Sequence, residues 1–170
     1  MELHYLSATS ALSKFKNKTL SPVELTEAII ERSEKINPKI NAHNFTFYEE
    51  AIINAKKSEG KYFANNEKIL PLEGIALAIK DEEDIEGQPN TNGSLILKDH
   101  IASKTMVDVE RIVNSGAIIH ARTTTPEFSC TSFTHSKLWG VTRNPWNLDF
   151  TPGGSSGGSG ASLAAGCSTL

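Results

Sequence analysis

Serine hydroxyls and glycines gather in one segment of the chain, residues 151–166. Six of its sixteen residues are glycine and four are serine. A glycine-rich backbone takes up positive φ values readily and can approach other groups closely, so it can present hydroxyl and backbone N–H groups together. The segment therefore predicts a loop that presents a serine for chemistry.

Two other uses of this composition compete with that interpretation. A flexible linker has the same Gly/Ser mixture. However, Pro152 restricts the backbone at the start of the segment, and the small residues 161–165 at its end predict the start of a helix, which a linker does not need. A phosphate-binding loop of the Walker type needs a lysine after its glycines. No lysine lies between Thr151 and Leu170, so the serine-presenting loop is favoured.

Lys80 is the second candidate because it follows a strand pattern with one nearly empty face. Large apolar residues alternate with Ala76 and Ala78 over residues 75–79, which is the period-two pattern of a strand. Small residues beside Lys80 would leave room for another group to reach its amine. Taken alone, the pattern favours the alternative, in which Lys80 only marks the solvated end of the strand before the acidic residues 81–84.

Other chemistry-bearing residues give weaker patterns. Ser13 and Lys16 match the S-x-x-K motif of one class of serine hydrolase, but a solvent-facing lysine on an amphipathic helix produces that match readily. The five histidines never approach metal-ligand spacing, and Cys130 and Cys167 form no CxxC pair. We therefore expect no metal, no cofactor and two free thiols that are buried or line a pocket.

The first 65 residues predict a helical segment that supports the rest. Ser7 is placed to cap a helix over residues 7–15, and a capping box at Ser21, with proline following, begins a helix over residues 22–37. We expect Asn37 and Pro38 to end that helix, residues 40–47 to be extended or irregular, and Gly60 to stop a third helix over residues 48–59.

Residues 66–170 predict an α/β core. After the strand at 75–79, Ser103 is placed to cap a helix that ends at Gly116, and residues 117–121 form a buried strand. Strand, helix and strand make a βαβ unit, so the sheet should contain parallel strands with functional groups at their carboxyl ends. Lys80 lies at one such end and residues 122–127 lie at the other.

Composition limits the partners. The 170 residues carry 17 Lys and Arg against 20 Asp and Glu, a net charge of -3, which removes the electrostatic case for binding nucleic acid or an anionic membrane. The first residues lack the basic region of a signal peptide, and no apolar run approaches the roughly 18 residues of a membrane helix. We expect a cytoplasmic protein whose partner is a small neutral molecule.

Four motifs together resemble the amidase signature family. They are residues 74–81 (GIALAIKD), Glu127 with Phe128, residues 140–146 (GVTRNPW) and residues 152–159 (PGGSSGGS). The glycine-serine run is the most specific of them. The resemblance implies an α/β fold with a mixed sheet flanked by helices, here incomplete and preceded by the helical segment.

The resemblance also implies roles for individual residues. Members of the family hydrolyse carboxamides with a nucleophilic serine, a second serine that follows a cis peptide bond, and a lysine, without a cofactor. Lys80 corresponds to the lysine, and Ser155 corresponds to the second serine, which relays a proton between nucleophile and lysine. The implied substrate-side residues are Ser129, Cys130, Thr131, Ser132 and Phe133. The implied loop-supporting residues are Gly153, Gly154, Ser156, Gly157, Gly158 and Ser159.

The family's nucleophile belongs to a later Gly-Gly-Ser motif that would lie beyond Leu170. We therefore expect these residues to be the N-terminal part of an amidase acting on a small amide, and the piece alone to be inactive. One alternative is the amidase subunit of an aminoacyl-tRNA amidotransferase, although residues 125–128 look more like stand-alone amidases. The other is a truncated, non-catalytic interaction module, and association into homo-oligomers stays open.

Overall fold

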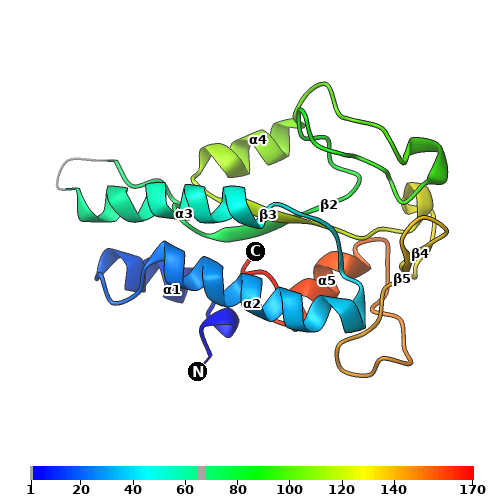
Figure 1. The fold of residues 1–170 in the computed structure, drawn as a ribbon, viewed down its shortest axis with the longest axis horizontal. Helices are drawn as coiled ribbons and strands as arrows, with labels where there is room; N and C mark the ends of the chain where they lie inside the picture. The colour runs from blue at the N-terminus through cyan, green and yellow to red at the C-terminus, as the bar shows by residue number, and fades with distance from the viewer. Residues whose placement is uncertain (1, 65–67) are drawn as a thin grey trace.

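The computed structural model describes residues 2–64 and 68–170. Its centre is a three-stranded sheet in the order β1-β3-β2, in which β2 and β3 are parallel and β1 is antiparallel to β3. The predicted mixed sheet flanked by helices is confirmed (Figure 1). In chain order the elements are η1 (Leu3–Tyr5), α1 (Ala8–Lys16), α2 (Pro22–Ile40), β1 (His43–Thr46), α3 (Tyr48–Phe63), β2 (Ala76–Lys80), η2 (Leu95–Leu97), α4 (Val107–Asn114), β3 (Ile118–Thr123), η3 (Glu127–Ser129), β4 (His135–Ser136), β5 (Gly140–Val141) and α5 (Gly157–Ala164).

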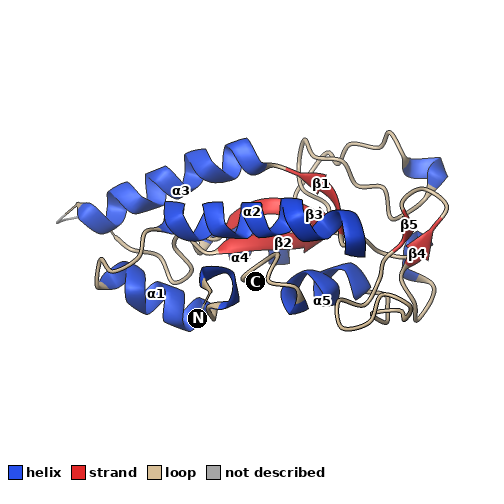
Figure 2. Ribbon diagram, turned by 60° about the horizontal axis from the view of Figure 1, so that its bottom comes forward, coloured by secondary structure: helices blue, strands red, loops and turns tan. Residues whose placement is uncertain are grey.

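Helices cover both faces of the sheet. On one face, Val109 of α4 packs against Leu77 and Ile79 of β2. On the other face lie α2 and α5, which pack against each other through Ile40 and Ala161, and Figure 2 shows α2 in front of the strands. Ala76 of β2 packs on this face, in one cluster with Leu25 and Ile29 of α2.

The N-terminal helices begin where the sequence predicts. Ser7 accepts a hydrogen bond from the Ser10 backbone N–H at 3.2 Å. At the start of α2 the Ser21 hydroxyl accepts from the Val23 N–H at 2.9 Å, and the Ser21 N–H donates to the Glu24 carboxylate at 2.7 Å. Both caps satisfy N–H groups that have no partner within the helix.

Two predicted helix ends are wrong, because α2 and α3 both continue past them. α2 passes through Pro38 to Ile40 and ends on Asn41, whose φ is 50° and whose N–H donates to the Asn37 carbonyl at 2.7 Å. α3 passes through Gly60 to Phe63. Tyr62 in this last turn is buried in the core and donates its hydroxyl proton to the Glu73 carbonyl, so packing outweighs the helix-breaking tendency of glycine.

The predicted βαβ unit is confirmed, with one correction at its helix. α4 begins at Val107 and its N-cap is Met106, so the predicted cap at Ser103 is wrong. Loop contacts explain the later start, since the Met106 N–H donates to the Asp84 carbonyl at 2.9 Å and Thr105 accepts from the Glu86 N–H at 3.0 Å. In the register of the two strands, Lys80 lies beside Thr123, so both carboxyl ends meet at one edge.

Within the part of the chain that the structure describes, no helix has the length and apolar character needed to cross a bilayer.

Candidate active site

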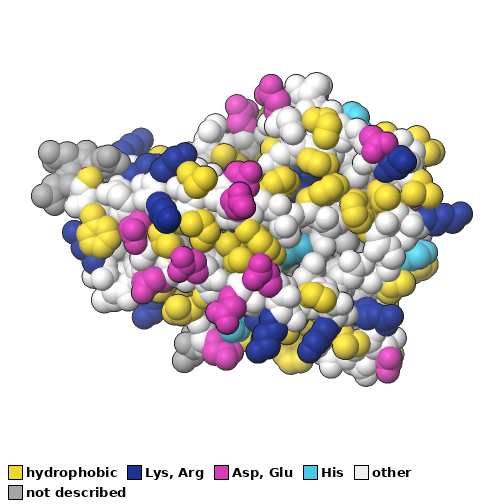
Figure 3. Space-filling view, viewed as in Figure 1, with side chains coloured by type: hydrophobic (Ala, Val, Ile, Leu, Met, Phe, Trp, Pro, Cys, Tyr) yellow, Lys and Arg dark blue, Asp and Glu magenta, His cyan; other side chains and the backbone are white. Residues whose placement is uncertain are grey.

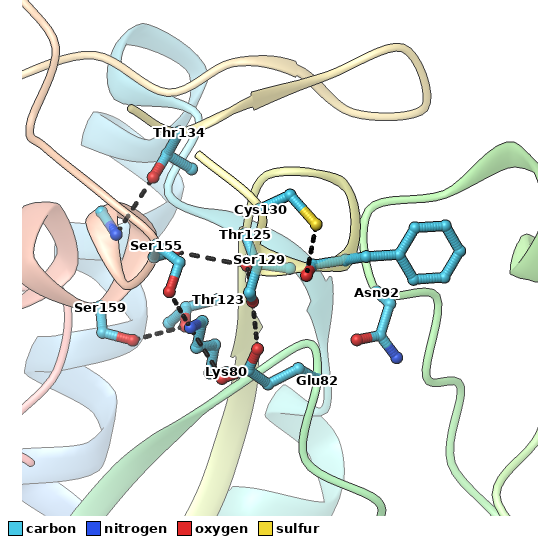
Figure 4. A network of polar contacts seen from close by, with 12 residues as sticks. Lys80, Glu82, Asn92, Thr123, Thr125, Ser129, Cys130, Thr134, Ser155 and Ser159 are labelled. Atoms are coloured by element: carbon cyan, nitrogen blue, oxygen red, sulfur yellow. Dashed lines mark hydrogen bonds and ion pairs between the residues drawn. The ribbon is translucent and has the colours of Figure 1, made fainter. Parts of the chain in front are cut away.

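Lys80 and Ser155 meet at the carboxyl edge of the parallel strands. The Lys80 Nζ donates a hydrogen bond to the Ser155 Oγ at 2.8 Å (Figure 4). The Lys80 side chain is only 11% exposed, so the interpretation of this lysine as the solvated end of a strand is wrong. The structure brings together the two residues that the sequence predicts as catalytic.

The loop that carries Ser155 is built on glycine. The peptide bond between Gly154 and Ser155 is cis, as the resemblance implies, and Gly153 has a φ of +91°. A Cβ on Gly154 would lie 2.8 Å from the Phe133 backbone nitrogen, and a Cβ on Gly158 would lie 2.5 Å from that of Thr124. Glycine is therefore required where the loop passes close to neighbouring backbone.

Hydroxyl groups of the neighbouring threonines hold this loop in place. Thr134 donates to the Gly153 carbonyl at 2.9 Å and accepts from the Gly157 N–H at 3.1 Å. Ser159 shares a hydrogen bond of 2.7 Å with Thr123 at the end of β3. Ser156 is exposed and makes no side-chain cap to α5, although its carbonyl accepts from the Gly160 N–H at 3.0 Å, so its support of the loop stays a prediction.

Glu82 is part of the same network, and the sequence interpretation missed it. Its carboxylate lies 2.7 Å from the Lys80 Nζ and also accepts a hydrogen bond from the Ser129 hydroxyl. Burial acts to raise the pKa of Glu82, but the hydrogen bonds from Lys80 and Ser129 and the charge of Lys80 outweigh it, so this pKa lies below its usual value. No sequence signal marks it, because Glu82 lies in the turn after β2, where the period-two alternation of a strand does not apply.

Asp81 points away from this network and anchors the opposite side of the strand end. Its buried carboxylate accepts hydrogen bonds from the Thr91 N–H at 2.8 Å and from the Asn44 side chain at 2.7 Å. Thr91 in turn accepts from the Trp139 indole at 2.9 Å. These bonds tie the loop after β2 to β1 and to the segment between β4 and β5.

Arg122 fixes the backbone around Lys80 from the neighbouring strand. Its buried guanidinium donates to the Lys80 carbonyl at 3.1 Å and to the Glu83 carbonyl. Burial lowers the pKa of Arg122 from its ordinary value, although nearby carboxylates such as Asp81 act in the opposite direction. The guanidinium therefore supplies hydrogen-bond donors to main-chain carbonyls of the turn that follows β2.

One of the predicted substrate-side residues reaches the network, and the other four are exposed at the surface. Ser129 contacts Glu82 and lies 3.0 Å from the Thr125 hydroxyl. Cys130, Thr131, Ser132 and Phe133 are exposed, and the Phe133 ring stacks on that of His135 at 5.1 Å. Their contact with substrate stays a prediction.

A metal centre finds no support in residues 2–64 and 68–170, where no group of three or more His, Cys, Asp or Glu side chains is placed to hold an ion. Both cysteines are free, Cys130 exposed and Cys167 buried. Proton transfer is the chemistry that the site can perform, because a hydroxyl and an amine lie within hydrogen-bonding distance in a half-buried position.

Comparison with known proteins adds to this geometry. The family model described as Amidase matches residues 24–170. The chain is 38% identical over 164 residues to an indoleacetamide hydrolase of Bradyrhizobium diazoefficiens, covering 96% of this chain and 31% of that protein. It is 40% identical over 166 residues to the A subunit of a glutamyl-tRNA(Gln) amidotransferase of Carboxydothermus hydrogenoformans, covering 98% and 34%.

The fold has a similar counterpart among solved structures. A bacterial aryl acylamidase of the amidase signature enzymes superposes with a TM-score of 0.92 at 30% identity, and the match covers 99% of this chain and 35% of that one. The chain thus spans about a third of the length of the relatives that it matches.

Proposed function

The chain belongs to the amidase signature family, and on that premise we propose that it is the N-terminal part of an enzyme that hydrolyses a carboxamide to a carboxylate and ammonia or an amine. The observation that carries the proposal is the hydrogen bond of 2.8 Å between the Lys80 amine and the Ser155 hydroxyl. The relatives whose names describe amide hydrolysis support the same reaction.

In the proposed mechanism, Lys80 is the general base and Ser155 is the relay. A lysine accepts a proton only as the free amine. Ser155 takes the proton of a nucleophilic serine supplied by a later part of the protein, and passes its own proton to Lys80, while the serine oxygen bonds to the amide carbon. The proton returns through Ser155 to the leaving nitrogen as the C–N bond breaks. Water, activated in the same way, then releases the carboxylate.

The surroundings of this pair take supporting roles in the proposal. Thr134 and Thr123 hold the glycine-serine loop, and residues 129–133 face the acyl side of the substrate. On the face drawn in Figure 3, Lys and Arg side chains are dispersed among acidic ones, which suits a small neutral amide better than nucleic acid. Two free cysteines suit the reducing conditions of the cytoplasm.

A second candidate is the amidase subunit of an aminoacyl-tRNA amidotransferase, which would release ammonia from glutamine with the same residues. The 40% identity to a protein of that kind favours it. The two candidates differ in substrate, since a stand-alone amidase accepts aryl or aliphatic amides, whereas the amidotransferase component would require glutamine and partner subunits.

The test is amide hydrolysis by the intact enzyme and by its Lys80→Ala variant, with ammonia detection on aryl amides, aliphatic amides and glutamine. Loss of the general base should lower kcat by about 10²- to 10⁴-fold. Lys57→Ala is the matched control, because Lys57 is exposed and its amine donates to the Asn54 side chain of the same helix, α3. A folded Lys80→Ala enzyme with full activity on every amide would refute the proposal.

A further inference from the structure

The carboxylate of Glu82 bridges the proposed general base and the predicted substrate side. One oxygen lies 2.7 Å from the Lys80 Nζ, and the other accepts a hydrogen bond from Ser129. Figure 4 shows the Glu82 side chain reaching toward both groups from the turn after β2. An ammonium has three N–H donors, and Ser155 and Glu82 take up two of those of Lys80.

The other charged groups near this amine are engaged elsewhere. Asp81 binds Thr91 and Asn44, and Arg122 donates to main-chain carbonyls. Asp84 accepts from the Asn90 side chain at 2.6 Å. Glu83 follows Glu82 directly, but its pKa is raised, first by burial and then by the charges of Asp108 and Glu82. Among the described residues, Glu82 is therefore the carboxylate in contact with Lys80.

We propose that Glu82 is a positioning residue for Lys80 and sets the lower end of the pH range in which the enzyme works. The proposal rests on the proposed function. An ionised carboxylate at this distance stabilises the ammonium form of its partner. Because the base acts only as the free amine, the charge of Glu82 moves the acid limb of the pH–activity profile to higher pH. Its two contacts also hold the Lys80 amine and Ser129 in fixed relative positions.

The first test compares the pH dependence of kcat/KM in the intact enzyme, in Glu82→Gln and in Glu83→Gln. Glutamine keeps an oxygen for Ser129 but removes the charge. We expect the acid limb of the Glu82→Gln profile to move to lower pH by roughly one unit, the lower part of the range for a close ion pair. Glu83→Gln removes the same charge one residue away, where Glu83 makes no hydrogen bond with Lys80 and interacts with it only through its charge, so its limb should move by clearly less than that of Glu82→Gln.

The second test needs no activity and separates the two proposals. In protein labelled at lysine with ¹³C and ¹⁵N, the Lys80 resonance is assigned by its loss in Lys80→Arg and followed through a pH titration. Its midpoint should move to lower pH in Glu82→Gln and by a clearly smaller amount in Glu83→Gln, and circular dichroism establishes that each variant is folded.

Parallel shifts of midpoint and acid limb in Glu82→Gln support the proposal, and an unchanged midpoint or an unchanged limb overturns it. If Glu82→Gln does not fold, Glu82→Asp, which keeps the charge on a shorter arm, should keep the limb and lower kcat; an unchanged kcat overturns the proposal. Full activity of a folded Lys80→Ala enzyme instead overturns the proposed function, whatever the midpoint does.

Discussion

Ser155 and Lys80 come from segments separated by 75 positions, yet their polar atoms lie 2.8 Å apart. Two features produce this meeting. The parallel register of β2 and β3 places Lys80 beside Thr123, and Thr123 in turn holds Ser159 of the loop. The hydroxyl is thus positioned by strand pairing rather than by local sequence, which gives the proposed relay a fixed geometry.

At this scale we predict that Ser155→Ala removes activity while leaving the fold intact. The alanine cannot carry a proton between nucleophile and Lys80, so kcat should fall by about 10²- to 10⁴-fold with little change in KM. Steady-state kinetics of the intact enzyme on the best amide measures this. Ser103→Ala, at an exposed serine of the loop before α4, should behave as the unmodified enzyme, and an active Ser155→Ala would contradict the relay.

The sequence identifies some site residues and misses others for a physical reason. Lys80 and Ser155 stand in motifs whose composition is unusual, a small-residue strand and a glycine-serine run. Glu82 stands in a run of four acidic residues, where composition indicates only a solvated turn. Its role depends on which way each side chain points, since Asp81 turns to Thr91 while Glu82 turns to Lys80. The direction of each side chain can be assigned only when the end of β2 and the turn that follows it are known.

At the scale of elements, the junction between the glycine-serine loop and α5 is set by close packing. α5 starts at Gly157 and lies against Thr134 and Thr124. A side chain at Gly157 or Gly158 would meet those threonines, whereas a Cβ added at Gly160 would have no neighbour within 4 Å. The start of α5 therefore packs closely against the edge of the sheet through Gly157 and Gly158. This close packing places Ser155 next to Lys80.

Two alanine substitutions in the same helix should have opposite effects on stability. Gly158→Ala places a methyl group against Thr124 backbone and should lower the free energy of unfolding by about 1–3 kcal/mol. Gly160→Ala meets open space inside a helix and should raise it by about 0.5–1 kcal/mol, because alanine has less conformational freedom to lose. Urea denaturation of both variants measures the difference, and equal effects would contradict the packing argument.

The elements are predictable from the sequence where a local signal dominates. The capping box at Ser21 starts α2 as predicted, because both its hydrogen bonds are made within four residues. Ends that depend on distant contacts are not predictable in this way. Tyr62 extends α3 past Gly60 by packing into the core, and the Met106 contact with Asp84 delays α4. The core residues around Tyr62 and the Asp84 carbonyl lie far from these helix ends in the sequence, so the local sequence pattern cannot reveal them.

At the scale of the whole molecule, a buried pair of histidines joins the sheet to α5, the helix that follows the glycine-serine loop. His43 of β1 and His120 of β3 have ring centroids 5.6 Å apart. His43 shares a hydrogen bond of 2.8 Å with Ser162 of α5, and His120 shares one of 3.3 Å with Ser168. Burial lowers the pKa of His43 to about 4, and burial together with the charge of His43 lowers the pKa of His120 to about 3.

This pair predicts that the fold loses stability in mild acid. Both histidines are neutral in the folded protein, but each binds a proton in the unfolded chain below about pH 6.5. The unfolded state therefore takes up more protons as the pH falls, and folding becomes less favourable by up to about 1.4 kcal/mol per pH unit for each histidine. Between pH 7.5 and 5 the pair should cost about 4 kcal/mol of unfolding free energy.

The measurement is the free energy of unfolding by urea at several pH values between 7.5 and 5, in the unmodified protein and in two asparagine variants. Comparing each variant with itself across pH removes any constant effect of the substitution on packing. His120→Asn should lose about half of the pH dependence, because one of the two buried groups no longer titrates. His100→Asn, at an exposed histidine, should keep all of it. A pH dependence that is undiminished in His120→Asn would show that the acid sensitivity does not arise from burial of His120.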